Sequence, residues 1–357
     1  MIHSNSEGDI YIEEMPLLLV HLREEEKGAD ARLSEVLSYA LDGYAYETAT
    51  EISAFEDYVN RWRCLEKTQN RKNPVQGRIL FAVPLGTSGI NLELYRLIRF
   101  LREHPDFLNG FVGGLLVDSE NDLYSKSAAK DLVFAANCAG CAFVGRPLVE
   151  GTRTLSNYTI VSNNLGTDLM GAYRESAAGL VKEVLGTDCV RKKCPKVLVL
   201  HASSHKTSNT YAIWNRVKEQ LPEMEIREIG LRNGTLSDCA GCPYKMCLHF
   251  GEQGSCFYGG VMVEDVYPAV READAIVMLC PNYNDALSAN LTAFINRLTS
   301  LFRTTRFYDK ALFAVVVSGY SGSDIVAEQL IAALNMNKTF YLPGHQFLFA
   351  EILTTLG

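Results

Sequence analysis

The sequence has no apolar stretch approaching the roughly 18 residues that a membrane-spanning helix needs. Its long apolar segments, such as 78–86 and 311–319, have the length of strands. Residues 1–16 are polar and acidic and lack the basic and apolar regions of a signal peptide. A formal net charge of -8 leaves no excess of Lys and Arg for non-specific binding to nucleic acid. We therefore expect a cytoplasmic protein that binds neither a membrane nor nucleic acid.

A disulfide framework is not expected either. The 10 cysteines occur without a secretory signal, and in a reducing compartment thiols serve as core residues, metal ligands or catalysts. With 357 residues the chain is long enough for two domains that each bury a core. No Gly/Ser-rich or Pro-rich tether separates its halves. We therefore expect residues 151–195, which contain an amphipathic helical pattern, to form a structured bridge.

Apolar runs bounded by turn residues alternate with helical periodicity in both halves of the chain, which is the pattern of a parallel α/β sheet. The strands expected in the first half are 16–22, 46–52, 78–86, 111–119 and 141–147. Those expected in the second half are 196–202, 225–231, 274–281, 311–319 and 339–344, with helices at 209–220, 265–273, 288–302 and 324–335. Five strands in this rhythm predict a flavodoxin-like, doubly wound sheet.

Particular residues recur at matching places in the two halves. His21 and His201 end the first strands, and Pro84 and Pro281 end the third strands. The segment "SGINLELYRLIRFL" is echoed by "LSANLTAFINRLTSLF". We interpret this as a tandem duplication, the alternative being the general likeness of α/β domains. The predicted fold is thus two tandem flavodoxin-like parallel five-stranded sheets, each between helical layers, with domains at 1–150 and 196–357 and the bridge at 151–195.

The first strand-to-helix turn of such a sheet commonly binds phosphate. In the second half this turn is "HASSHKTSNT", in which several hydroxyl side chains, His205 and Lys206 precede a helix N-terminus. These residues indicate a phosphate site, although helix capping alone favours the same residue types. The turn lacks the G-x-x-x-x-G-K-[ST] pattern of nucleotide-hydrolysing loops. The first half has Glu24, Glu25 and Glu26 here, which would repel phosphate, so we expect its domain to bind no cofactor.

Two segments of the second half resemble one known family. "HASSHKTSNT" resembles the S-P-R-K-x-G-N-T phosphate loop of the NADPH-dependent FMN reductase and iron-sulfur flavoprotein family. "ADAIVMLCPNYNDALSANLTAFINRLTSLF" resembles that family's A-D-x-I-x-x-x-x-P-x-Y-x-x-x-x-S-x-x-L-K-x-F-x-D-R stretch. The sequence departs from the pattern at Ser204, which replaces a Pro, and at the dipeptide Asn296-Arg297, which stands where the family has D-R. The resemblance implies a flavodoxin-like fold that binds FMN.

The resemblance also implies where FMN would lie. Its phosphate would contact Ser203, His205, Lys206, Ser208, Asn209 and Thr210. Its ring would lie against Pro281, Asn282, Tyr283, Asn284, Asp285, Ala286 and Leu287, with a third wall from Ser318, Gly319, Tyr320, Ser321 and Gly322. Pro fixes the first turn and Gly lets the main chain approach a flat ligand, although each residue alone also fits an ordinary loop. No catalytic side chain is predicted, because FMN itself carries the redox chemistry.

Four cysteines, Cys239, Cys242, Cys247 and Cys256, fall in a long predicted loop, 232–262. Thiolates at this density suit an iron-sulfur cluster or tetrahedral zinc. Members of the family bind a [4Fe-4S] cluster here through C-x2-C-x2-C and a fourth cysteine, but the second and last gaps of this sequence are longer. A cluster, zinc and metal-free thiols therefore all stay open. The other C-A-G-C, at Cys138 and Cys141, is interpreted as helix-end and core thiols.

These features predict an FMN-dependent NAD(P)H oxidoreductase that passes electrons to a quinone, flavin, metal or protein acceptor. One alternative is an electron-transfer flavoprotein in which FMN and an iron-sulfur cluster serve protein partners without a small substrate. Another is a scaffold that has lost its flavin. Because such reductases associate near the flavin, we expect the two domains to pair within the chain as a pseudo-dimer, with a homodimer of the whole chain left open.

Overall fold

The computed structural model describes residues 2–4, 10–12, 15–23, 27–68, 76–188, 192–203 and 208–351. The chain forms two compact units. The first unit comprises Met1–Phe100, Phe107–Ala128 and Leu148–Thr187, and the second comprises Leu101–Asp106, Ala129–Pro147 and Asp188–Gly357. Among the described residues, no helix is both long and apolar enough to cross a membrane.

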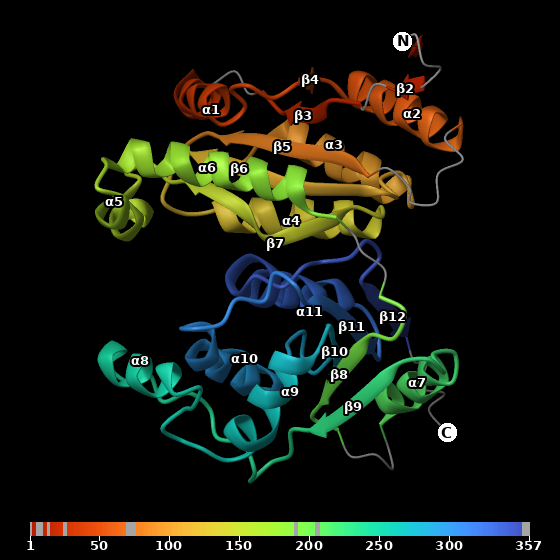
Figure 1. The fold of residues 1–357 in the computed structure, drawn as a ribbon, viewed down its shortest axis with the longest axis vertical. Coiled ribbons are helices and arrows are strands. Elements are labelled where there is room, and N and C mark those ends of the chain that lie inside the picture. The colour runs from red at the N-terminus through yellow and green to blue at the C-terminus, as the bar shows by residue number, and fades with distance from the viewer. Residues whose placement is uncertain are drawn as a thin grey trace. The chain divides into compact units, whose positions relative to one another are not determined.

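The first sheet has the strand order β4-β3-β5-β6-β7 (Figure 1). Its strands are β3 (Leu17–His21), β4 (Tyr46–Ala49), β5 (Gly77–Leu85), β6 (Phe111–Ser119) and β7 (Ala142–Gly151). The helices of this half are α1 (Lys27–Ala40), α2 (Ile52–Thr68), α3 (Leu92–Glu103), α4 (Ser125–Cys138), α5 (Thr159–Leu165) and α6 (Leu169–Gly186), with a 3-10 turn η1 (Ser156–Tyr158). A short antiparallel pair, β1 (Ile2–Ser4) and β2 (Ile10–Ile12), precedes them.

Helix α6 lies in the segment expected to bridge the domains, and it packs on the first sheet beside α1. Gly114 of β6 allows this close approach, because a Cβ there would lie 2.9 Å from atoms of both Leu180 and Val184. Tyr173 of α6 is fully buried and stacks on Tyr158 at 5.3 Å between ring centroids. The segment Leu148–Thr187 is therefore part of the first unit's core.

The second sheet has the strand order β12-β11-β10-β8-β9. Its strands are β8 (Lys196–His201), β9 (Glu225–Gly230), β10 (Ala275–Pro281), β11 (Ala311–Ser318) and β12 (Phe347–Glu351), paired in parallel. The helices are α7 (Asn209–Lys218), α8 (Tyr244–Glu252), α9 (Tyr267–Glu272), α10 (Ala289–Phe302) and α11 (Ser323–Leu330), with π-helical segments η2 (Met262–Val266) and η3 (Ile331–Met336). Successive residues of β10 are buried although they face opposite sides, so both faces of the sheet are covered.

Both sheets have the order 2-1-3-4-5 when their strands are numbered along each half, which is the flavodoxin-like order. The predicted fold class is confirmed. One strand was wrongly predicted: the last strand is β12, Phe347–Glu351, not 339–344. Thr339 and His345 have positive φ angles of 66° and 55°, and Pro343 lacks an N–H, so residues 339–344 cannot continue as a strand. Phe340 and Leu342, whose pattern suggested a strand, are buried in the core instead.

Helix α7 is fixed to strand β9 by one carboxylate. Glu228 accepts hydrogen bonds from Tyr211 Oη at 2.5 Å, Trp214 Nε1 at 3.1 Å and Lys218 Nζ at 2.8 Å. These donors are spaced three and four residues apart and so share one face of the helix. Burial alone would raise the pKa of Glu228, but the three hydrogen bonds lower it to about 2.

This lowered pKa predicts acid-sensitive stability. The stabilisation from Glu228 is present above its ordinary pKa of 4.5 and is lost as the pH falls from there toward about 2. At pH 7, Glu228→Gln should lower the free energy of unfolding by about 1.5 kcal/mol, a modest value because the carboxylate is partly exposed and screened. Urea unfolding between pH 7 and pH 3 measures both effects. A variant as stable as the wild type at pH 7 would contradict the assignment.

Candidate functional site

The carboxyl ends of β8, β10 and β11 meet at one edge of the second sheet, where flavodoxin-like sheets bind ligands at the point of strand reversal. The three loops that leave this edge begin at Ala202, Asn282 and Gly319. The sequence placed all of the predicted FMN contacts on these loops and on the first turn of α7.

The structure describes the two ends of the predicted phosphate loop but not its middle. His205 and Lys206 lie outside the described residues, as do Ser204 and Thr207. Ser208 caps α7, because its Oγ accepts a hydrogen bond from the Tyr211 N–H at 3.2 Å. Asn209 and Thr210 begin the helix, and Thr210 is buried. The helix N-terminus that would receive a phosphate is thus in place at this edge.

The loop after β10 makes a tight reversal. Tyr283 and Ala286 exchange backbone hydrogen bonds at 3.4 and 3.2 Å. Between them Asn284 and Asp285 have positive φ angles of 55° and 56°, the signature of a type I′ turn. Such angles are costly for residues other than Gly and persist only where the surroundings fix them.

The side-chain amide of Asn282 fixes this turn against the loop after β11. Its Nδ2 donates to Asp285 Oδ1 at 3.2 Å, to Ser318 Oγ at 2.6 Å and to the Ser321 carbonyl at 3.3 Å. Gly322 lies against the same turn at a φ of 96°, and a Cβ there would stand 1.9 Å from Asp285 Oδ1. The close approach of the two loops therefore requires glycine at 322.

Two aromatic side chains flank these loops. Tyr283 is 60% exposed and Tyr320 is 82% exposed. Neither is a packed core aromatic, which was the structural alternative for Tyr283. Both tyrosine side chains are therefore exposed to solvent at the edge where the sequence predicts a flat ligand.

Buried polar atoms without a protein partner gather at this edge. In the described part of the chain, Ser203 Oγ follows β8, Asn282 Oδ1 and Ser288 Oγ follow β10, and Ser323 Oγ follows β11; each is buried and makes no hydrogen bond. Unpaired buried polar groups are costly, so a native structure normally supplies a partner. Hydroxyl and amide groups at three converging strand ends fit the phosphate and polar ring edge of FMN.

The four clustered cysteines line a second site. Cys239, Cys242, Cys247 and Cys256 all face one cavity of about 360 Å³, beside helix α8 and the outer part of α10. Cys239 is exposed and the other three are half-buried. Within the described residues, however, no group of three or more His, Cys, Asp or Glu side chains is gathered closely enough to hold a single metal ion. The arrangement is therefore not that of a tetrahedral zinc site.

Arg297 of α10 and Arg303 at the C-terminal end of that helix also line this cavity. The sequence analysis gave them no role. Arg297 is only 2% exposed and donates from Nη2 to the Gly259 carbonyl at 2.7 Å. The Nε atoms of Arg297 and Arg303 are buried without a hydrogen-bond partner among the described residues. Neither arginine forms an ion pair with a described carboxylate. The cavity thus combines thiols with two guanidinium groups, of which that of Arg303 lies over the Tyr244 ring at 4.7 Å.

The thiols of the other C-A-G-C have a different environment. Cys141 is fully buried, and burial raises the pKa of Cys138 to about 11. Cys138 therefore stays protonated at neutral pH. The two residues lie at a helix end and in the core, as their pattern indicated.

Comparison with known proteins finds a family model similar to the second half of the chain. Residues 195–354 match the family model of NADPH-dependent FMN reductases. The match, which spans less than half of the chain, agrees with the resemblance seen in the two motifs. No curated protein matches the chain.

Solved structures of low similarity accompany this family match. One is an NAD(P)H:quinone oxidoreductase from Methanothermobacter marburgensis, 13% identical over 44% of this chain and 83% of that one, with a TM-score of 0.35. Another is an azoreductase from Bacillus anthracis, 18% identical over 44% and 86%, with a TM-score of 0.34. Smu.1420 from Streptococcus mutans is 13% identical over 44% and 86%, also at 0.34. At these scores they carry no argument about function.

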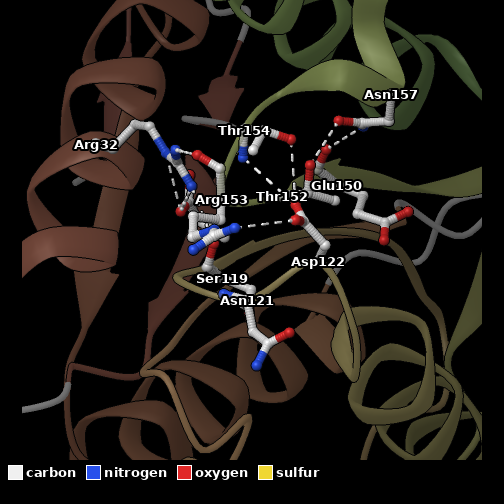
Figure 2. A network of polar contacts seen from close by, with 10 residues as sticks. Arg32, Ser119, Asn121, Asp122, Glu150, Thr152, Arg153, Thr154 and Asn157 are labelled. Atoms are coloured by element: carbon white, nitrogen blue, oxygen red, sulfur yellow. Dashed lines mark hydrogen bonds and ion pairs between the residues drawn. The ribbon is translucent and has the colours of Figure 1, made fainter.

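At the corresponding edge of the first sheet, charged side chains of the first unit contact one another. Arg32 donates from Nη2 and Nε to the carboxylate of Asp118, at 2.6 and 2.9 Å. Burial raises the pKa of Asp118, although Arg32 opposes the rise. Figure 2 shows Arg32 reaching the chain at Arg153, whose side chain turns toward Asp122.

The helix N-terminus of the first unit is also occupied. Glu120 Oε1 lies 1.8 Å from the position that a Cβ on Gly28 would take, in the first turn of α1. A carboxylate at this place satisfies the helix dipole that a phosphate would otherwise use. Glu24, Glu25 and Glu26, which the sequence analysis placed here, lie outside the described residues.

Proposed function

We propose that the second unit binds FMN at the carboxyl ends of β8, β10 and β11, and that the chain is an FMN-dependent NAD(P)H oxidoreductase. The observation that carries this proposal is the set of buried, unpartnered polar atoms at Ser203, Asn282, Ser288 and Ser323, within the residues that match the family. Among the described residues no protein group serves them, and they lie at the edge where doubly wound sheets commonly bind ligands.

The phosphate of FMN is assigned to the turn between β8 and α7. Ser203, Ser208, Asn209 and Thr210 supply hydroxyl, amide and backbone N–H groups there, and His205 and Lys206 complete the predicted set with positive charge. The first unit offers Glu120 at the equivalent helix end. Of the two helix ends, that of the second unit is therefore the one to which we assign the phosphate.

The ring of FMN is assigned to the loops 281–287 and 318–322. In the described structure the N–H groups of Asn284 and Asp285 donate to no protein atom, and so they are free to donate to a ligand. The exposed Tyr283 and Tyr320 are placed to cover its faces and exclude water. When bound, FMN supplies hydride acceptance from NAD(P)H and onward transfer of one or two electrons, so these residues need only bind and orient.

The pairing of the two units as a pseudo-dimer stays a prediction, as does a homodimer of the whole chain. The acceptor is proposed as a quinone, flavin, metal or protein.

NADPH or NADH should bleach the visible flavin band of the FMN-loaded chain when they are mixed without oxygen. Ser203→Ala should weaken FMN binding about tenfold, the effect of losing one well-placed hydrogen bond to a charged group. The same variant should leave the much weaker binding of riboflavin unchanged, because riboflavin has no phosphate. Fluorescence titration measures both affinities, with Ser53→Ala on the exposed face of α2 as the control. A wild-type chain that binds no FMN would overturn the proposal.

The thiol cavity favours a second candidate function, electron transfer between FMN and an iron-sulfur cluster. A [4Fe-4S] cluster takes one thiolate on each of four iron atoms, so it needs ligands spread around a cavity rather than gathered at one point. Cys239, Cys242, Cys247 and Cys256 provide such a set. Arg297 and Arg303 would offset the negative charge of the four thiolates.

Anaerobic reconstitution with iron and sulfide tests this second candidate. The wild type should retain about four iron atoms per chain, and Cys256→Ser should retain far less. Cys64→Ser removes an exposed thiol on α2 and should behave as the wild type. A wild-type chain that binds FMN but no iron would remove the cluster and leave the reductase proposal standing.

A further inference from the structure

Gln329 lies on α11, outside every motif that the sequence offered, and its side chain reaches the turn after β10. Its Nε2 donates to the Asp285 carbonyl at 3.0 Å, and its Oε1 accepts from the Leu287 N–H at 3.0 Å. One amide therefore holds the main chain on both sides of Ala286. No other side chain in the described residues makes hydrogen bonds to both of these backbone groups.

The turn that Gln329 holds is strained. Asn284 and Asp285 both occupy the left-handed region, which disfavours residues with a Cβ. Asn282 fixes the turn from the side of β11, and Gln329 fixes it from the side of α11. With both supports in place the free N–H groups of Asn284 and Asp285 have a defined direction before any ligand arrives.

Helix α11 is a rigid base for this contact. Val326, Ala327 and Leu330 are fully buried, so the helix cannot shift without opening the core. Gln329 itself is half-buried, which limits competition from water for its two hydrogen bonds. The position of the turn is thereby tied to the packing of the sheet.

We propose that Gln329 is a positioning residue that pre-orients the Asn284–Asp285 turn for the flavin ring, and that it thereby sets both the affinity for FMN and the reduction potential of the bound flavin. The inference rests on the proposed function. It concerns the direction of two backbone donors and assigns no contact between Gln329 and FMN itself. Hydrogen bonds from fixed donors to the ring are among the protein groups that tune a flavin.

The test compares Gln329→Met, which keeps the length of the side chain but removes both hydrogen bonds, with Gln329→Glu, which keeps an acceptor for the Leu287 N–H. The full chain is titrated with FMN, and the midpoint potential of the bound flavin is measured with redox dyes. Gln329→Met should weaken FMN binding about tenfold and shift the potential, and Gln329→Glu should recover part of the affinity.

Asn337→Ala serves as the matched control, because Asn337 donates a single bond to the Ala332 carbonyl near the end of the same helical segment, away from the turn. It should leave affinity and potential unchanged, since it removes a hydrogen bond of the same helical segment that does not reach the turn. If the wild type binds FMN and Gln329→Met keeps its affinity and potential, the inference fails and the proposed function stands. If the wild type binds no FMN, both fail.

Discussion

The hydrogen bonds of the Asn282 side chain link the loop after β10 to the loop after β11, and the geometry of the candidate site depends on these hydrogen bonds. Its Nδ2 lies within bonding distance of oxygen atoms on Asp285, Ser318 and Ser321, which determines the orientation of the amide. The remaining oxygen, Oδ1, is then buried without a partner among the described residues. Gly322 and the strained turn at Asn284 and Asp285 are consequences of how closely the two loops approach.

The two sheets share one topology but differ in the side chains at the corresponding edge. Both have the same strand order, and both place a helix N-terminus beside the first strand. In the first unit Glu120 lies at that helix end and Arg32 is bound to Asp118. In the second unit hydroxyl groups occupy the comparable edge and have no partners in the described structure. The difference is one of charge and hydrogen bonding rather than of backbone fold.

Much of the fold could be predicted because buried parallel strands leave long apolar runs between turn residues. The exception was the last strand, where Phe340 and Leu342 gave the same apolar signal from an irregular core segment. The residues of the candidate site fall in three short segments that sequence motifs can single out, and their role in binding FMN stays a prediction. Gln329 could not be predicted, because its side chain hydrogen-bonds the main chain of residues that lie 42 and 44 positions earlier in the sequence. The roles of Arg297 and Arg303 depend on burial and on missing partners, which sequence spacing does not reveal.

The central claim is that one unit of this chain binds FMN and that the other has closed its own site. The most direct measurement is the stoichiometry of FMN binding to the intact chain by calorimetric titration, with Arg32→Ala and Ser203→Ala variants alongside. The account predicts one FMN per wild-type chain, weakened by Ser203→Ala and unaffected by Arg32→Ala. Two FMN molecules per chain, or a single site weakened by Arg32→Ala alone, would contradict it.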